Sequence, residues 1–138
     1  MASAPIRVLI ADDDERFLQS LQTLIDGQPE LEVVAVARDG DDAVELGAEL
    51  TPEAAVIDLH MPRLEGIEAV RRLRQRHPSL CLIALTGDPS PKLRNAAERA
   101  GADGVFLKGE LLDRLLERLS RARAGGAARM ADAALAPE

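Results

Sequence analysis

Five short apolar runs, rich in β-branched residues, recur along the chain 23 to 26 residues apart, and a segment with helical periodicity follows each run. The runs begin near Ile6, Leu31, Ala54, Leu80 and Gly104. A strand followed by a helix, five times over, is the pattern of parallel strands joined by helical crossovers. The runs VLIA, VVAVA, AVID and LCLIALT are nearly continuously apolar, as strands covered on both faces require. The sequence therefore predicts an α/β protein with a doubly wound parallel sheet.

The helical segments each carry one apolar face, and the last face is the strongest. It is formed by Leu111, Leu112, Leu115, Leu116 and Leu119. A leucine-rich repeat has a similar period, but its fixed Leu/Asn spacing does not recur here. The length of 138 residues suits one domain and not two. We predict a domain over residues 1–123 and an Ala- and Gly-rich tail or linker stub over residues 124–138.

The composition excludes several classes of protein. A net charge of −7 argues against nonspecific binding to nucleic acid phosphates, and the two aromatics, Phe17 and Phe106, make no platform for stacking bases. The lone Cys81 rules out an intramolecular disulfide and a cysteine-based zinc site. The longest uncharged apolar stretches are under ten residues, too short to span a membrane, and the N-terminus lacks the pattern of a secretory signal. We therefore expect a cytoplasmic domain.

Polar side chains follow four of the predicted strands at their carboxyl ends, the edge where open α/β sheets bind ligands. These are Asp12, Asp13 and Asp14 after the first strand, then Asp58, Thr86 and Lys108. Crowded carboxylates repel one another unless a hard cation such as Mg²⁺ lies between them. A hydroxyl and an ammonium group suit an anion bound beside that cation. The set predicts a phosphoryl-transfer site, with Asp14 better explained as the N-terminal cap of the first helix.

The segments that carry these residues resemble the receiver domain of two-component response regulators. They read VLIADDDERF, VIDLHMPRLEGIEAVRRLR, IALTG and GVFLKG, and five separated positions match in order and spacing. The resemblance covers residues 6–123 and is nearest to the nitrate-response type subclass, through ADD at the first strand and LK at the fifth. It implies the flavodoxin-like (βα)5 fold with strand order 2-1-3-4-5.

The same resemblance implies a role for each site residue. Asp58 would be phosphorylated by a sensor histidine kinase or a phosphotransfer protein. Asp13 would bind Mg²⁺ directly and Asp12 largely through water, with Asp58 and the backbone carbonyl of His60 completing the protein ligands; Mn²⁺ would suit the same oxygens. The residues that would contact the phosphoryl group or govern the approach of its donor are Thr86, Gly87 and Lys108.

Two positions in the family flank the path of the attacking water, and here they hold His60 and Asp88. We expect these residues to set the lifetime of the phosphoryl group. An imidazole and a carboxylate at these positions can pair across the site, to obstruct or to orient water.

In the family that the sequence resembles, the threonine moves toward the phosphoryl group and an aromatic side chain three residues before the lysine then moves inward. In this sequence that switch position holds Val105. Successive strand residues point to opposite faces, so the neighbouring Phe106 cannot take its place. We therefore expect weak coupling between phosphorylation and readout. The bond between Lys108 and Gly109 is expected to be trans, because a cis bond without proline costs about 2.5–4 kcal/mol.

The leading hypothesis is a signalling switch that catalyses only its own phosphorylation and dephosphorylation, and changes partner binding or forms a homodimer when phosphorylated. The alternative is a pseudo-receiver that binds partners without phosphorylation, but such a site usually lacks one of the acids, the threonine or the lysine. A haloacid-dehalogenase-like phosphatase needs a second Asp where His60 stands. A dinucleotide-binding enzyme needs G-x-G-x-x-G after the first strand, and ADDDER is the opposite in charge.

Overall fold

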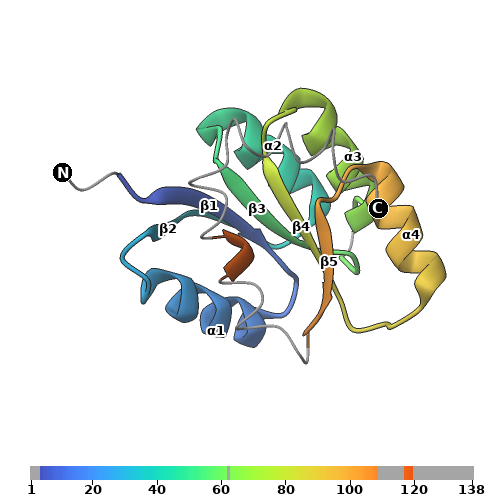
Figure 1. Cartoon of the computed structure of the whole chain (residues 1–138), viewed down its shortest axis with the longest axis horizontal. Helices are drawn as coiled ribbons and strands as arrows, with labels where there is room; N and C mark the ends of the chain where they lie inside the picture. Colours follow the sequence, from blue (N-terminus) through green and yellow to red (C-terminus); the bar gives the residue numbers. More distant parts are fainter. Residues whose placement is uncertain (1–3, 62, 109–116, 120–138) are drawn as a thin grey trace.

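One parallel sheet of five strands organises the chain (Figure 1). The computed structural model describes residues 4–61, 63–108 and 117–119. Its elements are β1 (Ile6–Ala11), α1 (Glu15–Asp26), β2 (Leu31–Ala37), α2 (Gly40–Leu50), β3 (Ala54–Asp58), α3 (Gly66–Arg76), β4 (Cys81–Thr86), α4 (Pro91–Ala100) and β5 (Gly104–Leu107). The strand order is β2-β1-β3-β4-β5 and every neighbouring pair is parallel. This confirms the predicted flavodoxin-like topology.

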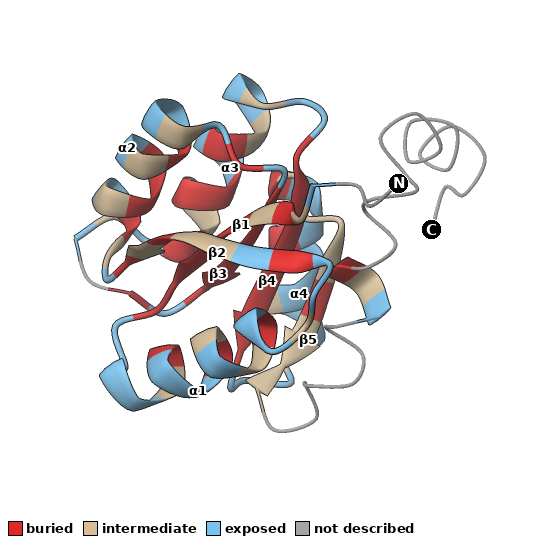
Figure 2. Cartoon of the chain, turned by 90° about the vertical axis from the view of Figure 1, so that its left-hand side faces the viewer, coloured by how far each residue is buried: buried red, intermediate tan, exposed pale blue. Residues whose placement is uncertain are grey.

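The sheet lies between two helical layers, and alternate strand residues feed two separate cores. Leu9 and Ala11 of β1 pack with residues of α2, α3 and α4 on one face. Ile6, Val8 and Ile10 pack with α1 and with Leu119 on the other face. Figure 2 shows buried residues filling the central strands β1, β3 and β4 and the inward sides of the helices. The near-continuous apolar strands thus have the two covered faces that their sequence predicts.

Aspartate side chains cap the first residues of α1 and α2. Asp14 caps α1 by accepting from the backbone N–H groups of Arg16 and Phe17, as the sequence predicts. Asp39 caps α2 through the N–H of Asp42. Because these caps follow β1 and β2 directly, they place the start of each helix beside the carboxyl edge of the sheet.

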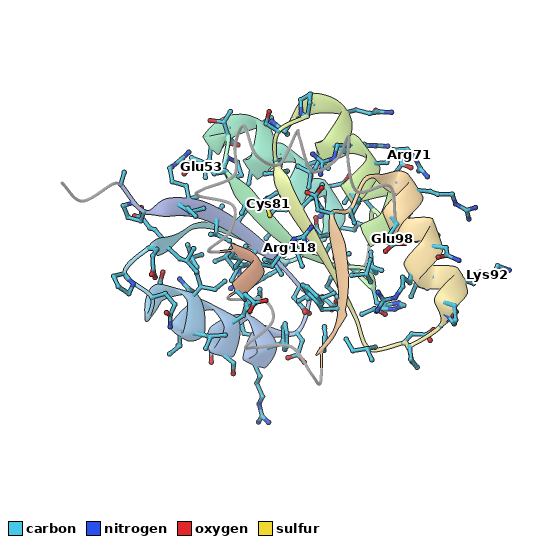
Figure 3. The ribbon with its side chains drawn as sticks, viewed as in Figure 1. Glu53, Arg71, Cys81, Lys92, Glu98 and Arg118 are labelled. Carbon is cyan, nitrogen blue, oxygen red and sulfur yellow. The ribbon has the colours of Figure 1, made fainter. Side chains whose placement is uncertain are left out.

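Most of the predicted elements are confirmed, and the differences are local. The fourth strand begins at Cys81 rather than Leu80, because the N–H of Leu80 closes a turn onto the carbonyl of His77. Cys81 is buried inside the sheet (Figure 3), as expected of a small apolar residue. The apolar stripe from Leu111 to Leu119 lies mainly outside the described residues, although Leu119 itself is buried against the α1 face.

Three further expectations concern parts of the chain that the structure does not describe or features that it tests only partly. Residues 124–138, the predicted tail, lie outside the described residues. So does Gly109, and with it the bond between Lys108 and Gly109. Within residues 4–61, 63–108 and 117–119, no helix has the length and apolar content needed to cross a bilayer.

Candidate functional site

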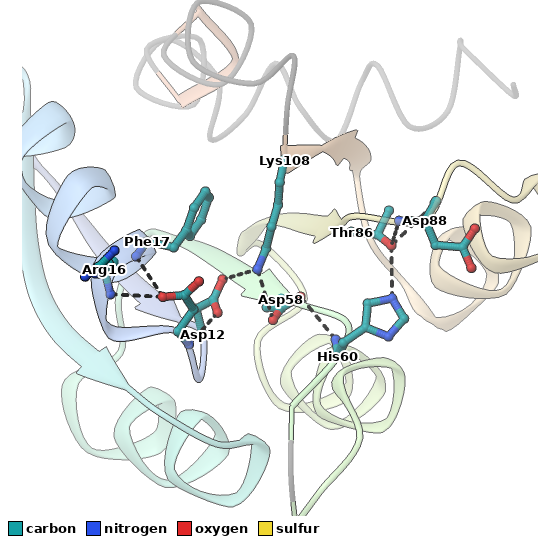
Figure 4. Close-up of polar contacts among 9 residues, drawn as sticks. Asp12, Arg16, Phe17, Asp58, His60, Thr86, Asp88 and Lys108 are labelled. Atoms are coloured by element: carbon teal, nitrogen blue, oxygen red, sulfur yellow. Dashed lines mark hydrogen bonds and ion pairs between the residues drawn. The ribbon is translucent and has the colours of Figure 1, made fainter.

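The carboxyl ends of the parallel strands bring the predicted site residues to one edge of the sheet (Figure 4). Asp12 directly follows β1, Asp58 ends β3, Thr86 ends β4, and Lys108 directly follows β5. The side chains of Asp12, Asp58 and Thr86 are buried. Residues separated by almost the whole described chain therefore form one compact polar cluster in an otherwise apolar sheet.

Three carboxylates in this cluster offer oxygen atoms for a cation. One oxygen each from Asp12, Asp13 and Asp58 lies within 4.8 Å of the others. Asp12 and Asp58 are buried, whereas Asp13 is exposed, so the group opens to solvent on one side. Hard carboxylate oxygens that leave room for water are what Mg²⁺ prefers in proteins. The residues therefore fit the predicted divalent cation site.

Lys108 supplies a positive charge between the two buried carboxylates. Its Nζ atom lies 2.7 Å from Oδ2 of Asp12 and 3.4 Å from Oδ2 of Asp58. The same ammonium group lies 4.6 Å from the centroid of the Phe17 ring. Burial disfavours the charged form of Lys108, but the hydrogen bond to Asp12 and the charge of Asp58 outweigh it and raise its pKa. The lysine is thus held in the charged form that an anion requires.

The environment of Asp58 perturbs its carboxyl group. Burial raises the pKa of Asp58 to about 6, with a further contribution from the charge of Asp12. The backbone N–H of His60, which donates to Oδ1 at 3.1 Å, and the charge of Lys108 oppose this shift. The carboxylate therefore lies in an electrostatically crowded position, as is common for residues that react.

Thr86 is held by two groups rather than left free at the strand end. Nε2 of His60 lies 3.1 Å from Oγ1 of Thr86, and the backbone N–H of Asp88 donates to the same oxygen at 2.9 Å. Among the described residues the His60 imidazole contacts Thr86 and forms no hydrogen bond or ion pair with the carboxylate of Asp88, whose Oδ1 accepts from the N–H of Ser90. The imidazole thus reaches Thr86 directly.

Gly87 and Val105 lie where the sequence places them. A Cβ atom built on Gly87 would meet no atom within 4 Å, so this exposed position leaves space next to Thr86. Val105 is buried on the α4 side of the sheet, and Phe106 packs on the α1 side. The switch position thus holds a small residue, with the ring of Phe106 on the opposite face as predicted.

Sequence reasoning missed the contact between Lys108 and Phe17. It considered Phe17 as one of the two aromatics that make no platform for stacking bases, whereas in the structure the residue packs against the core on the α1 side. The position of Phe17 in the sequence could have indicated this contact. Phe17 lies in the first turn of α1, next to the acidic loop formed by Asp12, Asp13 and Asp14. A residue there can face both the core and the site.

Comparison with known proteins agrees with this geometry. Residues 8–120 match the family model of the response regulator receiver domain. The chain is 34% identical over 122 residues to the transcriptional regulatory protein DegU of Brevibacillus brevis, covering 88% of this chain and 52% of DegU. The chain thus spans about half the length of that curated relative.

Solved structures give the same result. The signal receiver domain of an HD domain-containing protein from Pseudomonas fluorescens Pf-5 superposes with a TM-score of 0.82 at 30% identity, covering 91% of this chain and 99% of that one. A two-component response regulator of the LuxR family from Aurantimonas sp. SI85-9A1 superposes with a TM-score of 0.81 at 30% identity, covering 88% and 87%.

The chain is a member of the response regulator receiver domain family. Its relatives include transcriptional regulators, in agreement with the predicted nitrate-response type subclass. Acceptance of a phosphoryl group is the function of this family, whose members act as signalling switches supplied by histidine kinases.

Proposed function

We propose that Asp58 is the phospho-acceptor of a switch in two-component signal transduction. The observation that carries this proposal is the buried Asp58 carboxylate, with Lys108 Nζ at 3.4 Å and oxygens of Asp12 and Asp13 within 4.8 Å. Of these three carboxylates, Asp58 lies at the end of β3, the strand between β1, which precedes Asp12 and Asp13, and β4 and β5, which lead to Thr86 and Lys108. A phosphoryl group on Asp58 would therefore meet all the charged and polar groups of the site.

In the proposed step, an oxygen of Asp58 attacks the phosphorus atom of a phosphohistidine. An O–P bond forms while the N–P bond breaks, and the departing imidazole takes up a proton from solvent. Because its pKa is about 6, Asp58 is mainly ionised at neutral pH and has the lone pair that the attack needs. Water later attacks the acyl phosphate, releases inorganic phosphate and restores the carboxylate. Positioning and charge neutralisation supply most of the catalysis in such transfers.

The proposed resident ion is Mg²⁺, with Mn²⁺ accepted by the same ligands. Asp12, Asp13, Asp58 and the backbone carbonyl of His60 would hold it. When bound, the cation neutralises charge on the transferred phosphoryl oxygens. Lys108 and Thr86 would also donate to those oxygens.

The proposed donor is a sensor histidine kinase or a phosphotransfer protein. Such a donor draws its phosphoryl group from ATP, so we place the domain in the cytoplasm. The domain then acts as a switch that catalyses only its own phosphorylation and dephosphorylation, and phosphorylation changes partner binding or drives formation of a homodimer. Contact with DNA is not part of the proposal for this chain.

A phosphorylation-independent pseudo-receiver is the second candidate, and one experiment separates the two. The protein is incubated with acetyl phosphate and Mg²⁺ and its intact mass is measured. One added phosphoryl group in the wild type, and none in Asp58→Asn, supports the proposal. Asp14→Asn is the matched control, because it removes a nearby charge but keeps a good helix cap, and it should label like the wild type. A wild type that takes up no phosphoryl group supports the pseudo-receiver.

A further inference from the structure

Within the part of the chain that the structure describes, the Lys108 ammonium contacts Asp12, Asp58 and Phe17, and the Phe17 ring alone of these three keeps its charge distribution through the proposed reaction. Asp58 changes from a carboxylate to an acyl phosphate, and Asp12 is shared with the cation. The third neighbour is the Phe17 ring, whose centroid lies 4.6 Å from Nζ. The electron-rich face of an aromatic ring attracts an ammonium group at this distance.

Lys108 needs such a contact because of its position in the fold. It follows β5 at the edge of the sheet, and β4 and β3 lie between β5 and β1, the strand that precedes Asp12. The side chain must therefore extend across the site, as Figure 4 shows. A lysine held in one extended conformation gives up much of its rotamer freedom. Contacts that hold the ammonium group without involving the acids keep the lysine side chain from regaining this rotamer freedom.

The acidic loop holds Phe17 in register with Asp12. The backbone N–H of Asp14 donates to Oδ1 of Asp12 at 2.8 Å, and Oδ1 of Asp14 accepts from the N–H of Phe17 at 3.3 Å. Phe17 is also partly buried and packs against the core on the α1 side. Asp14 thus links the backbone of Phe17 to the carboxylate of Asp12 through two successive hydrogen bonds.

We infer that Phe17 is a positioning residue, whose ring face holds the Lys108 ammonium at the site while Asp58 gains and loses its phosphoryl group. The kinetic consequence of this inference rests on the proposed function, whereas the contact between Phe17 and Lys108 does not depend on it. This role requires no contact of Phe17 with the phosphoryl group or with the cation ligands. It acts through Lys108.

The contact has a spectroscopic signature that does not depend on phosphorylation. The chain has two lysines, Lys92 and Lys108, and Lys92 lies on the exposed side of α4 (Figure 3), which makes it an internal reference. In ¹³C-labelled protein, ring current from Phe17 should shift the ε-methylene protons of Lys108 upfield of those of Lys92. The shift should persist in Phe17→Tyr and disappear in Phe17→Leu. Equal shifts for the two lysines in the wild type would overturn the inference.

The kinetic test uses acetyl phosphate with Mg²⁺ and four proteins. Phe17→Leu, and pentafluorophenylalanine placed at position 17, should phosphorylate about fivefold more slowly than the wild type, because both lose the attractive ring face. Phe17→Tyr keeps that face and should stay within about twofold. The fluorinated ring keeps the packing shape, so a slow rate with it cannot come from a core defect.

A mutant cycle identifies Lys108 as the group that Phe17 acts through. In the Lys108→Ala background, Phe17→Leu should have no further effect on the phosphorylation rate. An equal loss in both backgrounds, or normal rates with the fluorinated ring, would overturn the inference and leave the proposed function intact. A wild type that takes up no phosphoryl group would instead refute the proposed function, while the proton shifts would still report whether the contact exists.

Discussion

Nε2 of His60 lies 3.1 Å from the hydroxyl oxygen of Thr86, so the residue two positions after the proposed acceptor is joined to the end of β4. The Thr86 hydroxyl also accepts from the backbone N–H of Asp88. In the tautomer whose Nε2 carries no proton, the Thr86 O–H donates to the imidazole, and a phosphoryl group on Asp58 would compete with the imidazole for this donor. The two residues expected to set the phosphoryl lifetime thus act on Thr86 in different ways, one by its side chain and one by its backbone.

Replacing both His60 and Asp88 with Ala should change the rate constant of dephosphorylation by more than about twofold, or roughly 0.4 kcal/mol in barrier. We expect His60→Ala to account for most of the change and to lengthen the lifetime by about threefold to tenfold, since a freed Thr86 can bind the phosphoryl group instead. The measurement is loss of the phosphoryl group after removal of the donor. Glu49→Ala, at an exposed position in α2, is the control. A double variant within about twofold of the wild type would contradict the prediction.

Removing the Asp13 carboxylate should abolish the dependence on Mg²⁺. Asp13 is the exposed member of the three-acid cluster, so its loss leaves the buried pair intact and takes away one cation ligand. In calorimetric titrations, Asp13→Ala should bind Mg²⁺ more than about tenfold more weakly than the wild type. Its labelling rate should no longer rise when Mg²⁺ is added. Asp14→Asn should titrate like the wild type, and equal affinities for wild type and Asp13→Ala would refute the assignment.

The parts of the site that follow from topology could be predicted from the sequence. Once five strand–helix units are recognised, the ends of parallel strands must meet at one edge, and this places Asp12, Asp58, Thr86 and Lys108 together. The caps at Asp14 and Asp39 follow from residue type and position alone. Each of these features depends on the course of the backbone, and the hydrophobic periodicity of the sequence predicts that course.

The parts that depend on side-chain conformation could not be predicted. The contact between His60 and Thr86 joins residues 26 positions apart through one rotamer of an imidazole. The contact between Lys108 and Phe17 depends on how far a flexible lysine extends across two strands. The sequence places the Asp88 carboxylate near His60, but a local hydrogen bond to the N–H of Ser90 draws it away.

Asp58→Asn should make the protein more stable near neutral pH in the absence of divalent cations. The pKa of Asp58 in the folded state is about 6, above its ordinary 3.8, so the folded protein holds this proton more tightly than the unfolded chain does. This raised pKa adds stability that is fully present below about pH 4 and is lost as the pH rises through about 6. Asn avoids the cost of the buried charge, and we expect a gain of about 1 to 3 kcal/mol at pH 7.5.

Urea unfolding at pH 7.5 and pH 4.5 checks this prediction, because the advantage of Asp58→Asn should shrink at the lower pH. Asp13→Asn is the matched control. Its side chain is exposed, so its charge loses little hydration on folding and its removal should stabilise the protein much less. A gain that is equal at both pH values would show that burial of the charge is not its cause.

Replacement by Ala should destabilise the fold at one glycine near the site and have little effect at another. A Cβ atom on Gly66 would lie 2.4 Å from the carbonyl oxygen of Asp58 and from Cα of Leu59, both backbone atoms that cannot move aside cheaply. Gly66→Ala should therefore destabilise the fold by about 1–3 kcal/mol in urea unfolding. A Cβ atom on Gly87 would meet open space, so the free energy of unfolding of Gly87→Ala should lie within about 0.5 kcal/mol of the wild-type value.

A second measurement on Gly87→Ala tests whether this position affects the access of the phosphoryl donor. Gly87→Ala should accept a phosphoryl group from acetyl phosphate at the wild-type rate, and more slowly from a bulky phosphohistidine protein, because the added methyl group stands in the space next to Thr86. Equal slowing with both donors would show that Gly87 acts on the chemistry and not on access.

Val105 should limit how strongly phosphorylation changes partner binding. Its side chain is 3% exposed and packs on the α4 side of the sheet, whereas Phe106 packs on the α1 side. A valine has few rotamers and little surface to withdraw, so it makes a poor two-state element when Thr86 moves. The readout should then depend on backbone shifts after β4 and on the exposed surface of α4. We expect coupling well below a hundredfold change in affinity, which corresponds to about 2.7 kcal/mol.

The measurement compares partner binding or self-association with and without the phosphoryl group on Asp58, in the wild type and in Val105→Tyr. Tyrosine restores a side chain that can move between a buried and an exposed position, so it should increase the change in affinity on phosphorylation. Phe106→Leu is the control, because it removes the ring on the opposite face and should leave the coupling as it is. A wild type that already changes affinity by more than about a hundredfold, with nothing added by Val105→Tyr, would show that the backbone carries the whole switch and that the identity of residue 105 does not limit it.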